Sequence, residues 1–150
     1  MRTCLLALGL AWAAVAPAAP AGAQPAPDLD RSLRRLVADY TRLYTRDSLP
    51  RWRELFLPTF TAASTTDEGS VSVRGLDEFY GAQERRFRTA TRMGERLENV
   101  RIERRGRMAT VWADFVFWND DDGRRGRLVL TAILEHERWR FHSLMFSYHR

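Results

Sequence analysis

The sequence predicts an α+β domain in which three helical segments come first and a curved antiparallel sheet follows, with the helices on one face of the sheet. Apolar residues recur with the helical period of about 3.6 in the first half, and from Gly94 onward the period changes to two. Two expected strands also carry large apolar side chains on both faces. Because a sheet covered on one side alternates apolar and polar residues, this pattern indicates that both faces are covered.

Two helices are expected before residue 59. Residues 29–46 place apolar side chains at helical spacing, with arginines and aspartates on the other side, which predicts an amphipathic helix. Ser48 is a residue type that caps helices, so a short second helix is expected after it. Pro50 falls in the first turn of this helix, where its missing N–H costs nothing. Pro58 is expected to end this helix.

A third helix is expected to begin at Gly75, after residues 59–73, which are irregular or form a short strand. Four arginines lie on its outer side: Arg85, Arg86, Arg88 and Arg92. A basic helical stripe is usually a solvated face, and we expect these side chains to be mostly in solvent. The weaker alternative is an interaction module that binds anionic surfaces through them.

Four strands are expected at 97–104, 108–119, 127–135 and 139–148, with turns at RRGR and NDDDG. The second and the last of them have two apolar faces, and one face of each should lie outside the core. The residues predicted on that outer face are Trp112, Asp114, Trp118, Leu144, Phe146 and Tyr148. Since no helix remains to cover it, the simplest cover is a second copy of the sheet, which predicts a symmetric homodimer.

The start of the chain is typical of a cleaved secretory signal. Residues 1–23 carry a basic residue, a short apolar run and small residues before Gln24. The apolar run is shorter than the ~20 residues that span a bilayer, and the alternative is a permanent signal anchor. Residues 24–28 are expected to be an extended spacer and 29–150 one domain. The protein is therefore expected to be periplasmic or secreted and not membrane-spanning.

The charge balance is basic, with a net charge of +5 and a pI near 10.3. Every basic side chain is Arg, and the arginines are interspersed with Asp and Glu. Nucleic-acid binding is not expected, because export separates the protein from cytoplasmic nucleic acid and the arginines form no single run. With Cys4 removed, the mature chain has no cysteine, so its core and not disulfides must hold it together.

The order of the elements and the motif G-R-x-x-L-x-x-x-x-E-x-x-x-W-x-F-x-S-x-x-x-S resemble the nuclear transport factor 2-like (NTF2-like) superfamily, in particular its SnoaL-like and ketosteroid-isomerase-like bacterial members. The matching residues are Gly126, Arg127, Leu130, Glu135, Trp139, Phe141 and Ser147. The resemblance covers residues 29–150. It implies a cone, or cystatin-like roll, whose curved sheet wraps around the first helices and encloses a pocket. It also implies dimers through the outer sheet face. The superfamily hosts enzymes, ligand binders and scaffolds, so the fold alone does not assign a function.

A pocket in such a cone would be lined mainly by apolar and aromatic groups with a few hydroxyls. The candidate lining residues are Tyr40, Tyr44, Trp52, Phe56, Tyr80, Phe115, Phe117, Trp139, Phe141, Ser143 and Met145. Such a lining is typical of a site for a small apolar ligand, and equally of a filled core.

The resemblance also permits a test for catalysis. Isomerases of this shape use a carboxylate base, a Tyr and a protonated Asp around an apolar pocket. Tyr40 is a plausible hydroxyl, but Ala113 stands where an inward carboxyl would be expected, and Ser143 and Met145 replace the two histidines of many similar bacterial proteins. No catalytic residue is assigned. The favoured hypothesis is a non-catalytic ligand-binding domain; the alternative is an isomerase, cyclase or dehydratase with Tyr40 or Tyr44 as hydrogen-bond donor.

No metal or cofactor is expected. The run NDDDG at 119–123 invites a calcium interpretation, but Trp118 and Val129 occupy the first and last ligand positions of the loop. The dipeptide Asp122-Gly123 favours a hairpin turn instead. The three histidines lack metal-ligand spacing.

Overall fold

A computed structural model describes residues 26–65 and 69–149. The elements in chain order are α1 (Ala26–Arg42), α2 (Leu49–Arg53), β1 (Phe56–Thr65), β2 (Val71–Gly75), α3 (Leu76–Thr89), β3 (Met93–Arg105), β4 (Met108–Asn119), β5 (Asp122–Glu135) and β6 (Arg138–Tyr148). The α+β class is thereby confirmed. The predicted signal peptide at 1–23 lies outside the described residues.

Several boundaries in the first half differ from those expected. Helix α1 begins at Ala26, so the last three residues of the spacer predicted at 24–28 are helical and that part of the prediction is wrong; Asp28 places a carboxylate in the first turn, where the helix dipole favours it. The same helix ends at Arg42 and not at residue 46. The segment predicted as irregular or a short strand forms the hairpin of β1 and β2, and Pro58 lies inside β1 instead of ending a helix.

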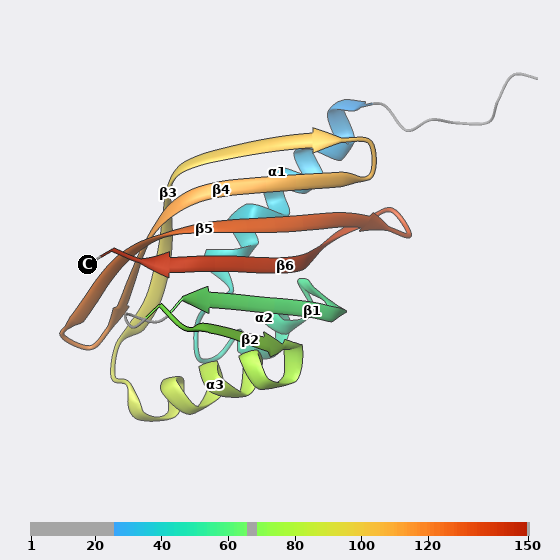
Figure 1. Cartoon of the computed structure of the whole chain (residues 1–150). Coiled ribbons are helices and arrows are strands. Elements are labelled where there is room, and N and C mark those ends of the chain that lie inside the picture. The colour runs from blue at the N-terminus through green and yellow to red at the C-terminus, as the bar shows by residue number, and fades with distance from the viewer. Residues whose placement is uncertain (1–25, 66–68, 150) are drawn as a thin grey trace, which may run out of the picture.

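Six strands form one sheet in the order β2-β1-β6-β5-β4-β3. All neighbouring pairs are antiparallel except β1 and β6, which run parallel. The sheet is strongly curved, α1 crosses behind its concave side, and α3 lies beside β2 at the other end (Figure 1). The predicted cone, a curved sheet wrapped around the first helices, is confirmed.

The core lies between the helices and the concave face of the sheet. Tyr40 of α1 packs against Phe141 of β6, with ring centroids 5.6 Å apart, and Trp52 of α2 packs against Phe56 at 4.6 Å. The indole N–H of Trp52 also donates a hydrogen bond of 2.8 Å to the backbone oxygen of Tyr40. Burying each such ring contributes about 1.5–3 kcal/mol, so this aromatic cluster anchors a five-residue helix too short to be stable alone.

The last strand does not alternate strictly, because it contains a β-bulge. Phe141 pairs with Ala132 and Ser143 with Thr131, which leaves His142 as an extra residue. The faces therefore exchange at His142. Up to Phe141 the odd-numbered residues face the core, and beyond it the even-numbered ones do.

This bulge overturns five assignments on β6. Leu144, Phe146 and Tyr148 were predicted on the outer face, but Leu144 is only 3% exposed and the two aromatic rings pack against the core. Conversely, Ser143 and Met145 were predicted inside, but both lie on the outer face, where Met145 is 56% exposed. A single extra residue reverses the facing of everything after it, because side chains alternate with a period of two.

The outer face carries a continuous apolar row across five strands. Val73, Ala63, Met145, Val129 and Trp112 stand opposite one another in successive strand pairs. Three of them are well exposed, at 62% for Val73, 56% for Met145 and 36% for Trp112. We refer to these five residues as the outer apolar row.

Asp114 and Trp118 also lie on the outer face, beside this row. Asp114 accepts hydrogen bonds from Asn99 and Arg127, at 2.8 and 3.2 Å. The ring of Trp118 lies over Gly94, where an added Cβ would come within 2.4 Å of the ring. Gly94 is thus needed for Trp118 to lie flat on the sheet.

The NDDDG segment is a hairpin turn, centred two residues earlier than Asp122-Gly123. Asn119 pairs with Asp122, and Asp120 adopts a positive φ of 53°. The Asp120 carboxylate accepts 2.8 Å hydrogen bonds from the backbone N–H groups of Thr91 and Arg92. Among the described residues no group of three or more His, Cys, Asp or Glu side chains is placed to hold a metal ion.

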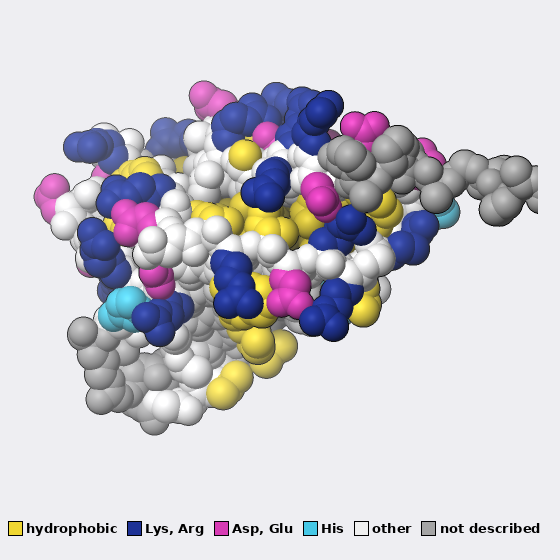
Figure 2. Space-filling model, turned by 90° about the horizontal axis from the view of Figure 1, so that it is seen from above, with side chains coloured by type: hydrophobic (Ala, Val, Ile, Leu, Met, Phe, Trp, Pro, Cys, Tyr) yellow, Lys and Arg dark blue, Asp and Glu magenta, His cyan; other side chains and the backbone are white. Residues whose placement is uncertain are grey.

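Charges of both signs are spread over the surface. The face seen in Figure 2 shows arginines interspersed with carboxylates and hydrophobic groups, and no single basic area. Within residues 26–65 and 69–149, no helix has the length and apolar character to cross a membrane.

Deleting His142 should remove the bulge and leave the facing of the strand unchanged, because Phe141 and Ser143 would then be consecutive, as their partners Ala132 and Thr131 are. Phe141 and Leu144 should stay in the core, so we expect the free energy of unfolding, measured by chemical denaturation, to fall by much less than the about 3 kcal/mol that emptying one large core position costs. The matched control is His142→Ala, which keeps the extra residue at an exposed position and should stay within about 0.5 kcal/mol of wild type. A loss of about 3 kcal/mol or more in the deletion variant would show that His142 is a regularly paired strand residue, and would contradict the assignment of the bulge.

Candidate functional site

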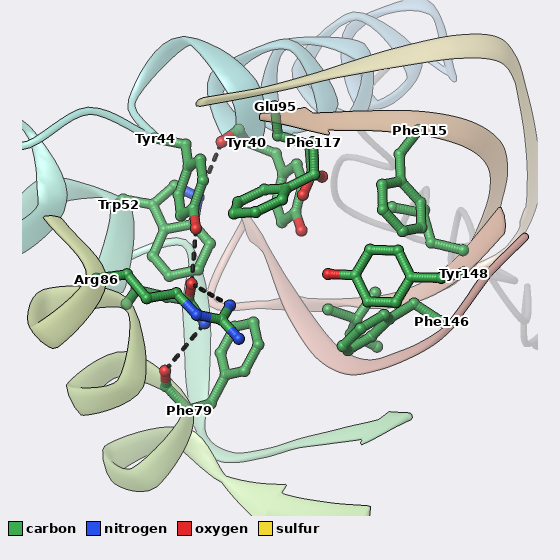
Figure 3. A pocket seen from close by; sticks show the side chains of 13 residues that line it. Tyr40, Tyr44, Trp52, Phe79, Arg86, Glu95, Phe115, Phe117, Phe146 and Tyr148 are labelled. Carbon is green, nitrogen blue, oxygen red and sulfur yellow. Dashed lines mark hydrogen bonds between the residues drawn. The ribbon is translucent and has the colours of Figure 1, made fainter. Parts of the chain in front are cut away.

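A pocket opens on the concave side of the sheet, between α1, α3 and strands β3 to β6. Figure 3 shows the side chains that line it: Tyr40, Tyr44, Trp52, Phe79, Gln83, Arg86, Glu95, Phe115, Phe117, Leu128, Leu144, Phe146 and Tyr148. Its unfilled volume is about 30 Å³, which holds one or two water molecules. A larger ligand must therefore displace side chains of the lining, of which Phe146 and Tyr148 are partly exposed.

The structure places five of the predicted pocket residues in this lining, namely Tyr40, Tyr44, Trp52, Phe115 and Phe117. Three more, Phe56, Trp139 and Phe141, are buried in the core but do not reach the pocket.

Tyr80 and Ser143 are wrongly predicted as pocket residues, as is Met145 on the outer face. The Tyr80 ring lies on the outer side of α3, beneath the guanidinium of Arg53 at 5.0 Å. The hydroxyl of Ser143 is hydrogen-bonded to Thr131 at 2.7 Å on the outer sheet face. The bulge explains Ser143 and Met145, and the helical phase of α3, which buries Phe79 and Gln83, explains Tyr80.

Glu95 is the pocket residue that sequence reasoning missed. It lies on β3 opposite Phe117 of β4, so its side chain shares the concave face with that ring. The strand was expected to begin at residue 97, whereas β3 begins at Met93. Side chains two residues apart on a strand share a face, so Glu95 lies on the same face as Leu97. If the strand had been expected to begin two residues earlier, the sequence would have predicted Glu95 on the inner face.

The Glu95 carboxyl is buried among aromatic rings. Burial raises the pKa of Glu95 from 4.5 to about 7, because the low-dielectric pocket disfavours the charged form. The hydroxyl of Tyr40 partly offsets this rise in pKa as a hydrogen-bonding neighbour of the carboxylate. Among the described residues, the Oε1 atom of Glu95 has no hydrogen-bond partner. The group is thus poised to hold or release a proton near neutral pH, with one oxygen unused by the fold.

Tyr40 is the tyrosine next to this carboxyl, and Tyr44 and Tyr148 line the same pocket. Burial, and secondarily the negative charge of Glu95, raise the pKa of Tyr40 and of Tyr44 well above the usual value of 10. Burial raises the pKa of Tyr148 as well, and Glu95 adds to that rise while Arg86 opposes it. All three hydroxyls therefore stay protonated at neutral pH and act as hydrogen-bond donors, within the fold or to a ligand.

Tyr44 is held by a buried amide. Its hydroxyl donates a 2.6 Å hydrogen bond to the Oε1 atom of Gln83, and the Gln83 Nε2 donates to the backbone oxygen of Phe79 at 3.3 Å. Gln83 is only 4% exposed and sits on the inner face of α3. This link between α3 and the segment that follows α1 fixes one wall of the pocket.

Arg86 separates from the expected basic stripe. Arg85, Arg88 and Arg92 do lie in solvent, but the guanidinium of Arg86 lines the pocket mouth. It lies 5.9 Å from the centre of the Phe117 ring, and its Nη1 is 3.4 Å from the Gln83 Oε1. Arg86 is exposed like the other three, as expected, and differs from them in that it also lines the pocket mouth.

The arrangement can support general acid–base chemistry. A carboxyl with a pKa near 7, inside an apolar pocket and beside protonated hydroxyls, has the properties of a proton-transfer group.

Replacing Glu95 should change how stability depends on pH. Because the pKa of Glu95 is raised in the folded state, the unfolded chain loses this proton first as the pH rises from about 4.5 to about 7. The free energy of unfolding should fall by at most about 3 kcal/mol between these two pH values. Above pH 7 the contribution of Glu95 should no longer change with pH. Glu95→Gln should remove the fall.

The measurement is chemical denaturation at several pH values between 4.5 and 8. The matched control is Glu98→Gln, which removes a carboxylate of the same strand that is ion-paired with Arg96 and Arg125. This control should keep the wild-type fall. Identical pH profiles for wild type and Glu95→Gln would show that Glu95 does not titrate in this window.

Comparisons with known proteins agree with this architecture. A family model described as a SnoaL-like domain matches residues 33–149. No curated protein matches the sequence significantly.

Solved structures share the fold at low sequence identity. An NTF2-like protein of unknown function from Silicibacter pomeroyi is 20% identical, with a TM-score of 0.64 over 84% of this chain and 100% of that chain. An NTF2-like protein with a cystatin-like fold from Novosphingobium aromaticivorans is 14% identical, with a TM-score of 0.65 over 81% and 82%. A proposed scytalone dehydratase from the same organism is 15% identical, with a TM-score of 0.67 over 83% and 89%.

At these identities the structural likeness establishes the fold and not an activity. The family model, in contrast, spans well over half of the sequence and includes the helices and strands that build the pocket. The chain therefore belongs to the SnoaL-like domain family of the NTF2-like superfamily.

Proposed function

We propose that the cone pocket binds a small, mainly apolar molecule and transfers a proton on it, with Glu95 as the general acid–base group. The observation that supports this most directly is the Glu95 carboxyl itself, buried in an aromatic pocket with a raised pKa and an unpartnered Oε1. The proposal departs from the non-catalytic domain favoured by sequence, because that hypothesis depended on finding no carboxyl on the inner face.

The energetics of Glu95 favour a functional role. A buried polar atom without a partner costs about 1–3 kcal/mol, and more for a charged group. An apolar residue at this position would fill the pocket at no such cost. The carboxyl at this position therefore lowers the stability of the fold. Catalytic acids and bases commonly lower stability in this way.

The geometry suggests a reaction at carbon next to a carbonyl group. The Glu95 carboxylate removes a proton from that carbon and becomes a neutral carboxylic acid, while the electron pair of the C–H bond moves to form an enolate. Tyr148, whose hydroxyl points into the pocket in Figure 3, donates a hydrogen bond to the enolate oxygen. Glu95 then returns the proton to a carbon atom of the same molecule, which completes an isomerisation or exchange.

Ligand binding without catalysis is the second candidate. As in the first candidate, aromatic side chains must move to admit the ligand, because the unfilled volume is about 30 Å³. Most of its lining is aromatic or aliphatic, as in sites that simply retain an apolar molecule.

We also propose that residues 1–23 direct export and are cleaved before Gln24, which would place the mature protein in the periplasm or outside the cell. The support is the pattern of a basic start, a short apolar run and small residues at the cleavage point. The core cluster around Trp52 would have to provide the stability that disulfides provide in many exported domains.

A homodimer through the outer sheet face is part of the same proposal. The outer apolar row extends over five strands and includes Trp112, whose ring also lies 5.2 Å from the guanidinium of Arg101. A row of hydroxyl side chains runs beside it, with Thr110, Thr131 and Ser143 opposite one another. An apolar centre with a polar margin is the composition of a protein–protein interface.

Glu95→Gln should abolish proton transfer. The assay follows deuterium incorporation next to the carbonyl of cyclohexanone in D₂O by proton NMR. Wild type should accelerate exchange over buffer, and Glu95→Gln should lose about 10²–10⁴-fold of the enzymatic rate. The matched control Glu98→Gln should keep the wild-type rate. Exchange by Glu95→Gln at the wild-type rate would exclude the proposal, whereas binding of cyclohexanone with no exchange would favour the second candidate.

Trp112→Arg should disrupt the proposed dimer. A charge in the middle of the outer apolar row cannot be buried without a partner, so we expect a folded monomer at half the wild-type mass. The measurement is light scattering, with circular dichroism as the test of folding. The control Arg35→Gln, on the exposed side of α1, should keep the wild-type mass. An unchanged mass for Trp112→Arg would show that this face is not the interface.

A further inference from the structure

Arg86 gives the pocket a second charged end. All residues of the pocket lining are described by the structure, and Arg86 is the only basic one among them. Among those residues, no carboxylate lies within 4.0 Å of its guanidinium, although thirteen other ion pairs form on the same surface. An arginine with no ion-pair partner, at the mouth of an apolar pocket, has its charge available for a ligand.

Two contacts hold the Arg86 guanidinium in position. One face of it lies over the Phe117 ring at 5.9 Å, and its Nη1 is 3.4 Å from the buried Gln83 Oε1. Gln83 is in turn fixed by Tyr44 and by the backbone of Phe79. The side chain is exposed, but these contacts place it at the pocket wall, whereas Arg85 and Arg88 of the same helix do not line the pocket.

The polar groups of the pocket are ordered between its two charges. Arg86 lowers, and Glu95 raises, the pKa of both Tyr44 and Tyr148, so each hydroxyl is close enough to feel both charges. Figure 3 shows the Tyr148 hydroxyl and the Arg86 guanidinium facing the same space from opposite sides, with the rings of Phe117 and Phe146 beside it. A ligand that fits this order has a negative group at one end, an apolar middle, and a polar group for Glu95 at the other.

We infer that the pocket selects small oxo acids: monoanionic carboxylic acids with a short apolar body and a carbonyl group distant from the carboxylate. The carboxylate pairs with the guanidinium of Arg86 at the mouth, in the bidentate geometry that arginine favours. The body lies against Phe117 and Phe146, and the carbonyl reaches the end of the pocket that holds Glu95. This inference rests on the proposed proton transfer and adds the substrate class and a specificity-determining residue.

The placement of charges also explains why one end of the pocket would reject the ligand's carboxylate. An anionic group beside Glu95 would meet a carboxyl that is already disfavoured as an anion by burial. The same group at Arg86 meets an unpaired cation in a site open to solvent, so it loses little hydration on binding. The ligand is therefore oriented with its acid outward and its carbonyl inward, which is the orientation that proton transfer at Glu95 requires.

The test compares 4-oxocyclohexanecarboxylate with its neutral methyl ester. The dissociation constants of both are measured by NMR titration, and deuterium exchange next to the ketone is followed in parallel. Wild type should bind the acid about tenfold more tightly than the ester, and this preference should weaken as ionic strength rises. Arg86→Gln should lose the preference, with a rise of about tenfold in the dissociation constant and KM of the acid and no change for the ester.

Arg85→Gln and Arg88→Gln are the matched controls, because they remove the same charge from neighbouring turns of α3 without touching the pocket. Both should keep the wild-type preference for the acid. If Arg86→Gln and these controls bind the acid alike, the inference fails. The proposed function is then still tested by deuterium exchange next to the ketone of the methyl ester. If neither compound binds wild type, the proposed function itself fails. Folding of Arg86→Gln is verified by its melting temperature, and Arg86→Lys, which keeps the charge, should restore part of the preference.

Discussion

The structure depends on the packing of the first two helices into the concave side of the sheet. The indole of Trp52 is 1% exposed, bonds to the backbone of Tyr40 and contacts the rings of Tyr44, Phe56 and Phe79. These contacts join α1, α2, α3 and β1 at one point. Because α2 has only five residues, its position is set by this burial and not by its own helical stability. Tyr40 and Tyr44, which face the pocket, contact Trp52 in the same cluster.

The second constraint is the β-bulge at His142. It lets the C-terminal half of β6 turn Leu144, Phe146 and Tyr148 toward the core, where two of them contact Phe115. If His142 were paired like its neighbours, the same strand would present a serine and a methionine to the pocket. Bulges bend and twist the strand that contains them, and the strong curvature of this sheet is consistent with that effect. The aromatic mouth of the pocket therefore depends on how β6 pairs with β5 at this point, where His142 is left unpaired.

The pocket combines two environments that oppose each other. Its inner end buries Glu95 without a full set of hydrogen bonds, and its mouth exposes Arg86 without a carboxylate partner among the described residues. The two groups do not neutralise each other, although both act on the hydroxyls of Tyr44 and Tyr148. A fold selected for stability alone would pair such charges or replace them with apolar residues. Their separation is what makes the pocket a candidate for binding and chemistry.

The sequence by itself determined the fold class, the four long strands of the second half and the family, because hydrophobic periodicity and motif spacing are local signals that survive without coordinates. It also predicted Tyr40, Tyr44 and Trp52 in the pocket lining, although Tyr44 follows α1 and does not lie on a helix. The tertiary structure alone decided which half of β6 faces the pocket, since a bulge leaves no residue-type signature at His142. It likewise decided that Glu95 stands inside and that the exposed Arg86 lines the pocket mouth. Both depend on where a strand begins and on which neighbour a side chain meets, and these are non-local properties that a one-dimensional pattern does not contain.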